Sequence, residues 1–490
     1  MLFLQTLLES NVNEVVRIKR NYVFSVLSIS SRLIANVIVF WMMARFYSLE
    51  SFGQITFAHT LATTFILLAD FGFDILLTNE LARSRENGRE LFQKYFSLKL
   101  MFTFLSFMVM CSFVFLSDVN IEMRILALIF SLYMVFTTQS NFIFAFFRGY
   151  EKFNYESVIS LLMNMGLLVL VITMVLFKSN TIFIAVGFAV SRFVGFIIGV
   201  LYSYRIIPDL SYKPVFKGLT EIRSKVFVYG FHFLFSYLFF QLDTILLALW
   251  KNEYEVGIYQ AVYKLIMLPL VIPDIFANSL LPSLSKYYVE ENRKWRTIGK
   301  LMSKSLLIII LPAFLVLQCY PTEVIEFIYG SKDYFAAVQI MEVFSLTLLV
   351  RFLLEPFALM ITTSNHQSIR LYTVIAATLL NFTLNLFAIP QYGAYGAAIV
   401  SLITNSFVAL IYFGASWSLF KDWIFDWKTI LLLLLLPLTV FFLKHFVKNS
   451  IWEALPILVF LMVAAGYFYF SQQERKWILT NNYSLLLQKK

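Results

Sequence analysis

Apolar residues along this chain occur in long runs, which are separated by short stretches rich in charged or turn-forming residues. Most runs hold about twenty residues, the length that an α-helix needs to cross roughly 30 Å of hydrocarbon. A transmembrane β-barrel would instead show alternating segments of about ten residues. The pattern therefore predicts an all-α integral membrane protein with about fourteen transmembrane helices. The predicted spans are 22–45, 53–78, 96–117, 124–147, 157–177, 181–204, 226–249, 257–282, 301–320, 336–363, 371–389, 395–417, 429–447 and 452–470.

The composition agrees with this pattern. Of the 490 residues, 60% are hydrophobic and 14% are charged, whereas soluble proteins carry about 25% charged residues. So little charge could not cover the surface of a soluble globule. The net charge of +10 would suit a nucleic-acid partner, but the charges lie in short connections between apolar runs. We therefore expect a membrane protein with no nucleic-acid partner.

The distribution of Lys and Arg predicts the orientation. If the N-terminus is cytoplasmic, the cytoplasmic connections carry 26 Lys and Arg residues and the outer ones carry 6. Cytoplasmic loops are enriched in these residues, so both termini are predicted to be cytoplasmic. The longest outer connection is 321–335, which leaves no room for a soluble domain. The sequence thus predicts a multi-pass protein of the cell (cytoplasmic or inner) membrane that acts within the bilayer.

The chain also carries a weak internal repeat. A shift of 204 residues places Phe52-Gly53 on Val256-Gly257 and Asp70 on Asp274. Repeats of this kind are typical of secondary transporters, whose substrate site lies between the repeats. The repeat predicts an N-terminal lobe of six helices over 1–225 and a C-terminal lobe of six helices over 226–425. Two additional helices and a cytoplasmic tail occupy 426–490.

Several short motifs occur in order over nearly the whole chain. They are Asp70-Phe71-Gly72-Phe73 with Leu81-Ala82-Arg83, Phe147-Arg148-Gly149-Tyr150-Glu151-Lys152-Phe153, Leu242-Asp243-Thr244-Ile245, Val256-Gly257-Ile258-Tyr259 with Tyr263-Lys264-Leu265, Phe327-Ile328-Tyr329-Gly330 and Tyr392-Gly393-Ala394-Tyr395-Gly396-Ala397-Ala398. In these stretches the chain resembles the polysaccharide-transport branch, the oligosaccharide-lipid flippases, of the multidrug/oligosaccharidyl-lipid/polysaccharide (MOP) exporter superfamily.

The resemblance implies two six-helix lobes around a central cavity and a lipid-linked oligosaccharide as substrate. The expected function is a flippase that moves a polyprenyl-diphosphate-linked oligosaccharide, a precursor of a cell-surface polysaccharide, from the cytoplasmic to the outer leaflet by alternating access. A MATE-like antiporter of drugs or organic cations, coupled to an ion, is the alternative on the same scaffold. The glycan, and whether a polysaccharide polymerase or ligase acts with the protein, stay open.

Nine ionisable residues stand out inside the predicted spans. An uncompensated charge near mid-bilayer costs about 3 kcal/mol, so nine would cost roughly 27 kcal/mol, more than the net stability of about 5–15 kcal/mol that proteins have. Most of them must therefore be paired or face water. They are Arg32, Asp70, Asp74, Arg192, Asp243, Lys264, Asp274, Arg351 and Glu355.

The four cations among them are candidates for substrate binding. A cationic cavity suits a lipid diphosphate, and the guanidinium fork of Arg donates two parallel hydrogen bonds to phosphate. The alternative is that each cation belongs to a structural pair between helices. The candidate substrate-binding residues are Arg32, Lys264, Arg192 and Arg351.

The five acids are candidates for gating or for coupling to an ion; the alternative is helix–helix hydrogen bonding. They are Asp70, Asp74, Asp243, Asp274 and Glu355. Their depths in the predicted spans predict three pairings: Arg32 with Asp70 or Asp74, Asp243 with Lys264, and Arg351 with Glu355 one helical turn away.

Proline residues adjoin two of these acids. Pro269 and Pro273 precede Asp274, and Pro356 follows Glu355. Proline inside a helix removes a backbone hydrogen bond and clashes with the preceding turn. We therefore expect a kink or break in the spans 257–282 and 336–363, and broken helices beside acids are common at transporter sites.

The remaining chemistry is sparse. The chain has no Walker A loop, HExxH or CxxC motif, so neither a catalytic residue nor a metal site nor a cofactor is expected. An oligosaccharide ligase, polymerase or glycosyltransferase would need a larger outer loop, which argues against an enzyme. Transport would instead draw on the membrane potential, with possible coupling to H⁺ or Na⁺.

Overall fold

The computed structural model describes residues 24, 27–28, 31–215, 241–330, 332–364, 366–419, 426–446, 451–472 and 474–475. Within these ranges every regular element is a helix. Nine of the described helices are long and apolar enough to cross a membrane, and a bent pair of helices makes a tenth. The all-α membrane fold is therefore confirmed, while the count of fourteen crossings stays a prediction.

The chain divides into two compact units, Met1–Gly257 (unit 1) and Ile258–Lys490 (unit 2), each described here by itself. The predicted lobe boundary at 225 falls in the segment 216–240, outside the described residues. The predicted cytoplasmic segment 1–21 also lies outside them, and so does most of the predicted cytoplasmic tail 471–490.

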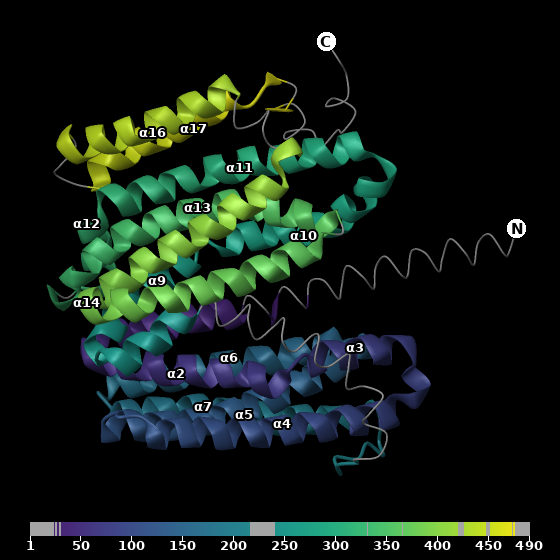
Figure 1. Cartoon of the computed structure of the whole chain (residues 1–490). Helices are drawn as coiled ribbons and strands as arrows, with labels where there is room; N and C mark the ends of the chain where they lie inside the picture. The colour runs from purple at the N-terminus through teal and green to yellow at the C-terminus, as the bar shows by residue number, and fades with distance from the viewer. Residues whose placement is uncertain are drawn as a thin grey trace, which may run out of the picture. The chain divides into compact units, whose positions relative to one another are not determined.

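Unit 1 is a bundle in which α5 is central and contacts α2, α3, α4, α6 and α7 (Figure 1). Its helices are 31–46, α2 (Leu49–Asp70), α3 (Phe73–Arg83), α4 (Gly88–Leu116), α5 (Ile121–Gly149), α6 (Phe153–Leu176), α7 (Thr181–Ser203) and Gln241–Trp250. The outer faces of α4 and α6 expose large apolar side chains such as Phe104 and Val169. Such faces suit contact with lipid rather than water.

In unit 2, α13 packs against α10, α11, α12 and α14, while α16 and α17 pack on each other and on α11 (Figure 1). The helices are α9 (Glu253–Met267), which begins in unit 1 and continues into unit 2, α10 (Val271–Glu290), α11 (Asn292–Cys319), α12 (Pro321–Tyr329), α13 (Ala337–Thr363), α14 (Gln367–Ala415), α16 (Trp427–Phe446) and α17 (Ile451–Tyr469). The predicted outer connection 321–335 is thus partly helical.

Three breaks interrupt long helices. Between α2 and α3, Phe71 and Gly72 both adopt left-handed backbone angles, with φ of 43° and 87°. Between α9 and α10 the chain bends by 40° next to Pro269, as the proline pattern predicted. Inside α14 two helices meet at Gly393, whose φ of 56° and ψ of −135° are not helical.

Pro356 does not break its helix, because α13 runs without interruption from Ala337 to Thr363. The span 336–363 is therefore not broken, and the other expectation for it, a kink at Pro356, stays a prediction. The expected kink or break is confirmed for the span 257–282. The two breaks at α2–α3 and α9–α10 each place a candidate acid beside an interrupted helix: Asp70 at the end of α2 and Asp274 in the first turn of α10.

Candidate functional site

Arg192 is a buried cation in the middle of α7, with 6% of its surface exposed. Its Nη2 donates to Asn164 Oδ1 on α6 at 3.2 Å, and its guanidinium lies 5.7 Å from the centre of the Tyr133 ring on α5. Its Nε has no hydrogen-bond partner within the described residues. The amide and the ring orient the guanidinium, but neither neutralises its charge.

Arg32 lies on the helix 31–46, near Arg192. The two are close enough to repel each other electrostatically, and the Arg32 side chain is exposed. The helix 31–46 is positioned against α6 by Ser31, whose Oγ accepts a hydrogen bond from Asn164 Nδ2 at 3.3 Å. Asn164 thus contacts both segments that carry these two arginines.

Two further charged side chains complete this group. Arg148, in the last turn of α5, lies 3.7 Å from the carboxylate of Glu156 in the first turn of α6, and both interact electrostatically with Arg32. We call Arg32, Arg148, Arg192 and Glu156 the cationic cluster. Its formal charge is +2, because it holds three guanidinium groups and one carboxylate, which interacts with Arg148 and Arg32. Among the described residues, no carboxylate forms an ion pair with Arg32 or Arg192.

Asp70 and Asp74 lie on the two sides of the α2–α3 break, and one buried lysine of α4 holds both. Lys99 Nζ lies 2.6 Å from Asp70 Oδ1 and 2.8 Å from Asp74 Oδ1, with no exposed side-chain surface. The Asp74 backbone N–H also donates to Asp70 Oδ1 at 3.2 Å. We call these residues the carboxylate–lysine triad. Its formal charge is −1.

The predicted pairing of Arg32 with Asp70 or Asp74 was therefore wrong. The face of the first helix that carries Ser28 and Ser31 packs on α6. Arg32 consequently lies beside Glu156 and Arg192 instead of the α2–α3 break. Lys99 takes the place that the prediction gave to Arg32.

Unit 2 gathers a second charged group around the α9–α10 break. Asp274, Arg351 and Glu355 all interact electrostatically with one another. Arg370, in the first turn of α14, interacts with Glu355 and donates from Nη1 to Thr362 Oγ1 at 2.6 Å. We call Asp274, Arg351, Glu355 and Arg370 the balanced cluster, since two acids face two bases. Arg351 and Glu355 thus interact electrostatically, while the predicted ion pair between them stays a prediction.

Lys264 and Asp243 lie in different units. Lys264 is half-buried on α9 in unit 2, one turn before the break, and Asp243 is 3% exposed on the helix Gln241–Trp250 in unit 1. Both have interactions of their own. Their pairing stays a prediction.

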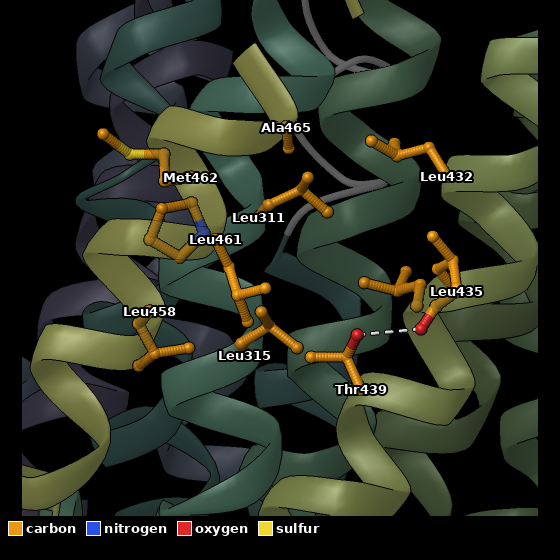
Figure 2. A pocket seen from close by; sticks show the side chains of 11 residues that line it. Leu311, Leu315, Leu432, Leu435, Thr439, Leu458, Leu461, Met462 and Ala465 are labelled. Atoms are coloured by element: carbon orange, nitrogen blue, oxygen red, sulfur yellow. Dashed lines mark hydrogen bonds between the residues drawn. The ribbon is translucent and has the colours of Figure 1, made fainter. Parts of the chain in front are cut away.

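Apolar cavities adjoin the two C-terminal helices. One, of about 110 Å³, lies between α11, α16 and α17. Figure 2 shows its wall of leucine side chains, in which the Thr439 hydroxyl donates to the Leu435 carbonyl at 2.8 Å. A larger cavity, of about 420 Å³, continues from Met462 of α17 to Pro269 at the α9–α10 break. Apolar walls of this kind suit a hydrocarbon chain.

Comparison with protein families decides the affiliation of the chain. The family model described as polysaccharide biosynthesis protein matches residues 18–288, which is more than half of the 490 residues. The chain belongs to this family. No curated protein matches this polysaccharide biosynthesis family member.

Solved structures with the same fold are transporters and flippases. The lipid II flippase MurJ in an inward closed conformation superposes with a TM-score of 0.72 at 18% identity, covering 93% of this chain and 100% of MurJ. An inward-facing multidrug resistance MATE transporter of the MOP superfamily gives 0.63 at 14% identity, covering 80% and 97%. A MOP superfamily transporter from Pyrococcus furiosus gives 0.57 at 15% identity, covering 83% and 96%. The resemblance to the MOP superfamily is confirmed, and these likenesses establish the fold.

Sequence reasoning missed several residues of these groups. The predicted span 96–117 begins just before Lys99, whereas α4 begins at Gly88, so this lysine lies three turns inside the helix. Arg148 and Glu156 were assigned to a connection that the structure makes helical up to Gly149 and again from Phe153. In the predicted spans Lys99 lies nearer the cytoplasmic end than Asp70, so the one signal for the triad was that two acids inside a span require a nearby cation.

Proposed function

We propose that this protein is a flippase for a polyprenyl-diphosphate-linked oligosaccharide, moving it from the cytoplasmic to the outer leaflet of the cell membrane. The chain would cross the membrane fourteen times with both termini cytoplasmic. It would work by alternating access between its two lobes, without an enzymatic step and without a cofactor. Arg32 and Arg192 would hold the diphosphate, and Lys264 and Arg351 would contribute from the second lobe.

The +2 charge of the cationic cluster carries this proposal. A buried arginine costs about 2.5–3.5 kcal/mol at the centre of a bilayer. The two groups that contact Arg192 are neutral, and the charged Arg32 nearby repels it. A diphosphate diester brings two negative charges and several acceptor oxygens. It would therefore balance the charge of the cluster and satisfy Arg192 Nε, which lacks a partner among the described residues.

The apolar cavities support a lipid carrier. The substrate joins a charged diphosphate to a long hydrocarbon chain, and the chain needs an apolar path while the diphosphate crosses. The walls of the cavity between α11, α16 and α17, and of the larger one that reaches Pro269, offer such surfaces. We propose that the polyprenyl chain lies along them.

The carboxylate–lysine triad supports coupling to an ion. Its two carboxylates share one ammonium group, so the triad holds an unbalanced negative charge inside the predicted membrane region. Binding of one H⁺ or one Na⁺ would neutralise it. We propose that Asp70 and Asp74 supply this coupling, and that Asp243, Asp274 and Glu355 act in gating.

The first test is leaflet exchange of a fluorescent polyprenyl-diphosphate oligosaccharide in proteoliposomes. Hydrogen bonds to charged groups contribute about 1.5–3 kcal/mol each, so Arg192→Gln is expected to slow exchange roughly 10- to 100-fold. Arg192→Lys keeps the charge but loses the fork, and an intermediate rate is expected.

Arg124→Gln is the matched control. Arg124 lies in the first turn of α5, at the end opposite to Arg148 of the cationic cluster, and it donates to the Ser117 carbonyl. It should leave exchange within about twofold of the unmodified protein. Equal losses in Arg124→Gln and Arg192→Gln would contradict a specific cationic site.

An ion-coupled antiporter of organic cations is the second candidate. The acids Asp274 and Glu355 of the balanced cluster favour it, because cationic substrates bind to carboxylates. The same proteoliposomes decide between the two: uptake of an organic cation against a proton or sodium gradient, with no movement of the lipid diphosphate, would replace the flippase by the antiporter.

A further inference from the structure

A polar cavity of about 260 Å³ lies at the end of unit 2 that the charge pattern predicts to be cytoplasmic. It is formed where α10 ends, α11 begins, α13 ends and α14 both begins and ends. None of its lining residues belongs to the cationic cluster, the triad or the balanced cluster. The cavity is therefore a separate feature of the molecule.

Two helix N-termini converge on this cavity. Asn292 and Arg296 line it from the first turns of the 28-residue helix α11, and His366 and Ile369 line it from the start of α14. The N-cap residues of both helices make no side-chain capping hydrogen bond. The N–H groups at a helix N-terminus carry a partial positive charge of about half an elementary charge, and such ends bind anions.

Side chains add donors to the same wall. Arg296 is exposed, and its Nε donates to Asn292 Oδ1 at 2.9 Å, which fixes the plane of the guanidinium. His366 Nδ1 lies 3.1 Å from Ser364 Oγ, and both residues line the cavity. No carboxylate is among the described residues that line it. Glu291, just outside, is 3.5 Å from Lys294.

Ser416 is an independent sign of a missing partner. It lines the cavity with 2% of its surface exposed, and its Oγ has no hydrogen-bond partner within the described part of the chain. A buried hydroxyl without a partner is unfavourable, and an acceptor oxygen of a ligand would relieve this.

We propose that this cavity is a binding site for one phosphate group, either the headgroup phosphate of an anionic phospholipid or a free phosphate. Arg296 supplies the fixed charge, and the two helix N-termini and the serine hydroxyls supply neutral donors. Basic pockets between transmembrane helices on the cytoplasmic side bind anionic lipid headgroups. The volume is below the roughly 300 Å³ at which drug-sized pockets begin, so a headgroup fits and an oligosaccharide does not.

The test titrates the purified full-length protein with two probes. Native mass spectrometry measures binding of phosphatidylglycerol, and isothermal calorimetry measures binding of inorganic phosphate. Arg296→Gln is expected to weaken binding at least about tenfold, because a charged fork is lost. Arg293→Gln is the matched control: Arg293 is exposed in the first turn of α11 but does not line the cavity.

Retention of the lipid alone assigns the site to a headgroup, and binding of inorganic phosphate alone assigns it to a soluble phosphate; either supports the proposal. Where Arg296→Gln lowers the melting temperature without ligand, His366→Gln repeats the test at an exposed position. The proposal is wrong if neither probe binds, or if Arg293→Gln and the cavity variants weaken binding equally. Leaflet exchange plays no part in these readouts, so they stand apart from the flippase assay.

Discussion

Lys99 and Arg192 are both buried basic side chains of unit 1, and their surroundings give them different roles. Lys99 lies between two carboxylates at 2.6 and 2.8 Å, so its charge is balanced inside the protein. Arg192 contacts an amide and an aromatic ring. These contacts leave its charge unbalanced, so it can bind an anion. A buried cation paired with carboxylates leaves little charge uncompensated, and loss of either partner is costly, whereas an unbalanced cation suits a ligand.

Lys99→Met should therefore destabilise the protein strongly. Removing one partner of a buried ion pair costs about 3–5 kcal/mol because the other charge stays buried, and here two carboxylates would remain. The expected result is a clear loss of unfolding free energy, measured by denaturant titration in detergent. Lys286→Met is the control, since Lys286 is exposed and 3.6 Å from Glu290, and surface pairs contribute about 0.3–0.5 kcal/mol. A loss no larger than that of the control would contradict the triad.

At this scale the sequence located the charged residues but not all of their partners. Asp70 and Asp74 lie in a predicted span, so they require a cation at a similar depth in the membrane. Arg32, at a similar predicted depth in the first span, was the predicted partner. The choice failed because helix packing, set by Ser31 and Asn164, turns Arg32 to another neighbour. Depth can be derived from residue counting, whereas the direction of a helix face depends on contacts between distant segments.

At the scale of the helices, the breaks place the charged groups. The left-handed residues Phe71 and Gly72 end α2 and start α3, and this brings Asp70 and Asp74 to one ammonium group. The α9–α10 break likewise brings Asp274 near Arg351. A continuous helix would have placed Asp70 and Asp74 one turn apart, with no interruption at which a charged group could collect.

Gly393→Ala is expected to disturb the junction inside α14. Gly393 is buried, and its backbone angles lie in a region that residues with a side chain rarely adopt. Holding alanine there costs about 1–3 kcal/mol, so the melting temperature should fall. Gly166→Ala on α6 is the matched control: an added methyl group meets nothing within 4 Å, and alanine favours a helix by about 0.5–1 kcal/mol. Equal effects of the two changes would show that the junction carries no strain.

Proline was an unreliable signal for these helix breaks. Pro269 marked the bend between α9 and α10, but α13 continues through Pro356, because a proline costs a helix one hydrogen bond and neighbouring helices can compensate. The α2–α3 break has no proline, and Gly72 was its only local signal. The alternation of apolar runs predicted helix positions well, since each run must satisfy its backbone internally to cross lipid.

At the scale of the whole molecule, the arginine-containing clusters of the two units differ in formal charge. The cationic cluster of unit 1 carries a formal +2, while the balanced cluster of unit 2 is neutral. The internal repeat therefore does not extend to the electrostatics of the two groups. If the substrate is a diphosphate, its main charged contacts lie in unit 1, and unit 2 offers the apolar cavities beside α11 and α17.

The membrane potential should then bias the leaflet distribution of the substrate. Moving one negative charge outward across an inside-negative membrane gains about 2.3 kcal/mol per 100 mV, so a diphosphate with two charges gains roughly 4.6 kcal/mol if no other charge moves. A potassium gradient with valinomycin across proteoliposomes is expected to shift the labelled lipid diphosphate toward the positive side. Vesicles without valinomycin, or with Arg192→Gln, should show little shift on the same timescale. A distribution that ignores the potential but follows a proton or sodium gradient would mean that a cation moves with the substrate, and the carboxylate–lysine triad would then be its first candidate carrier.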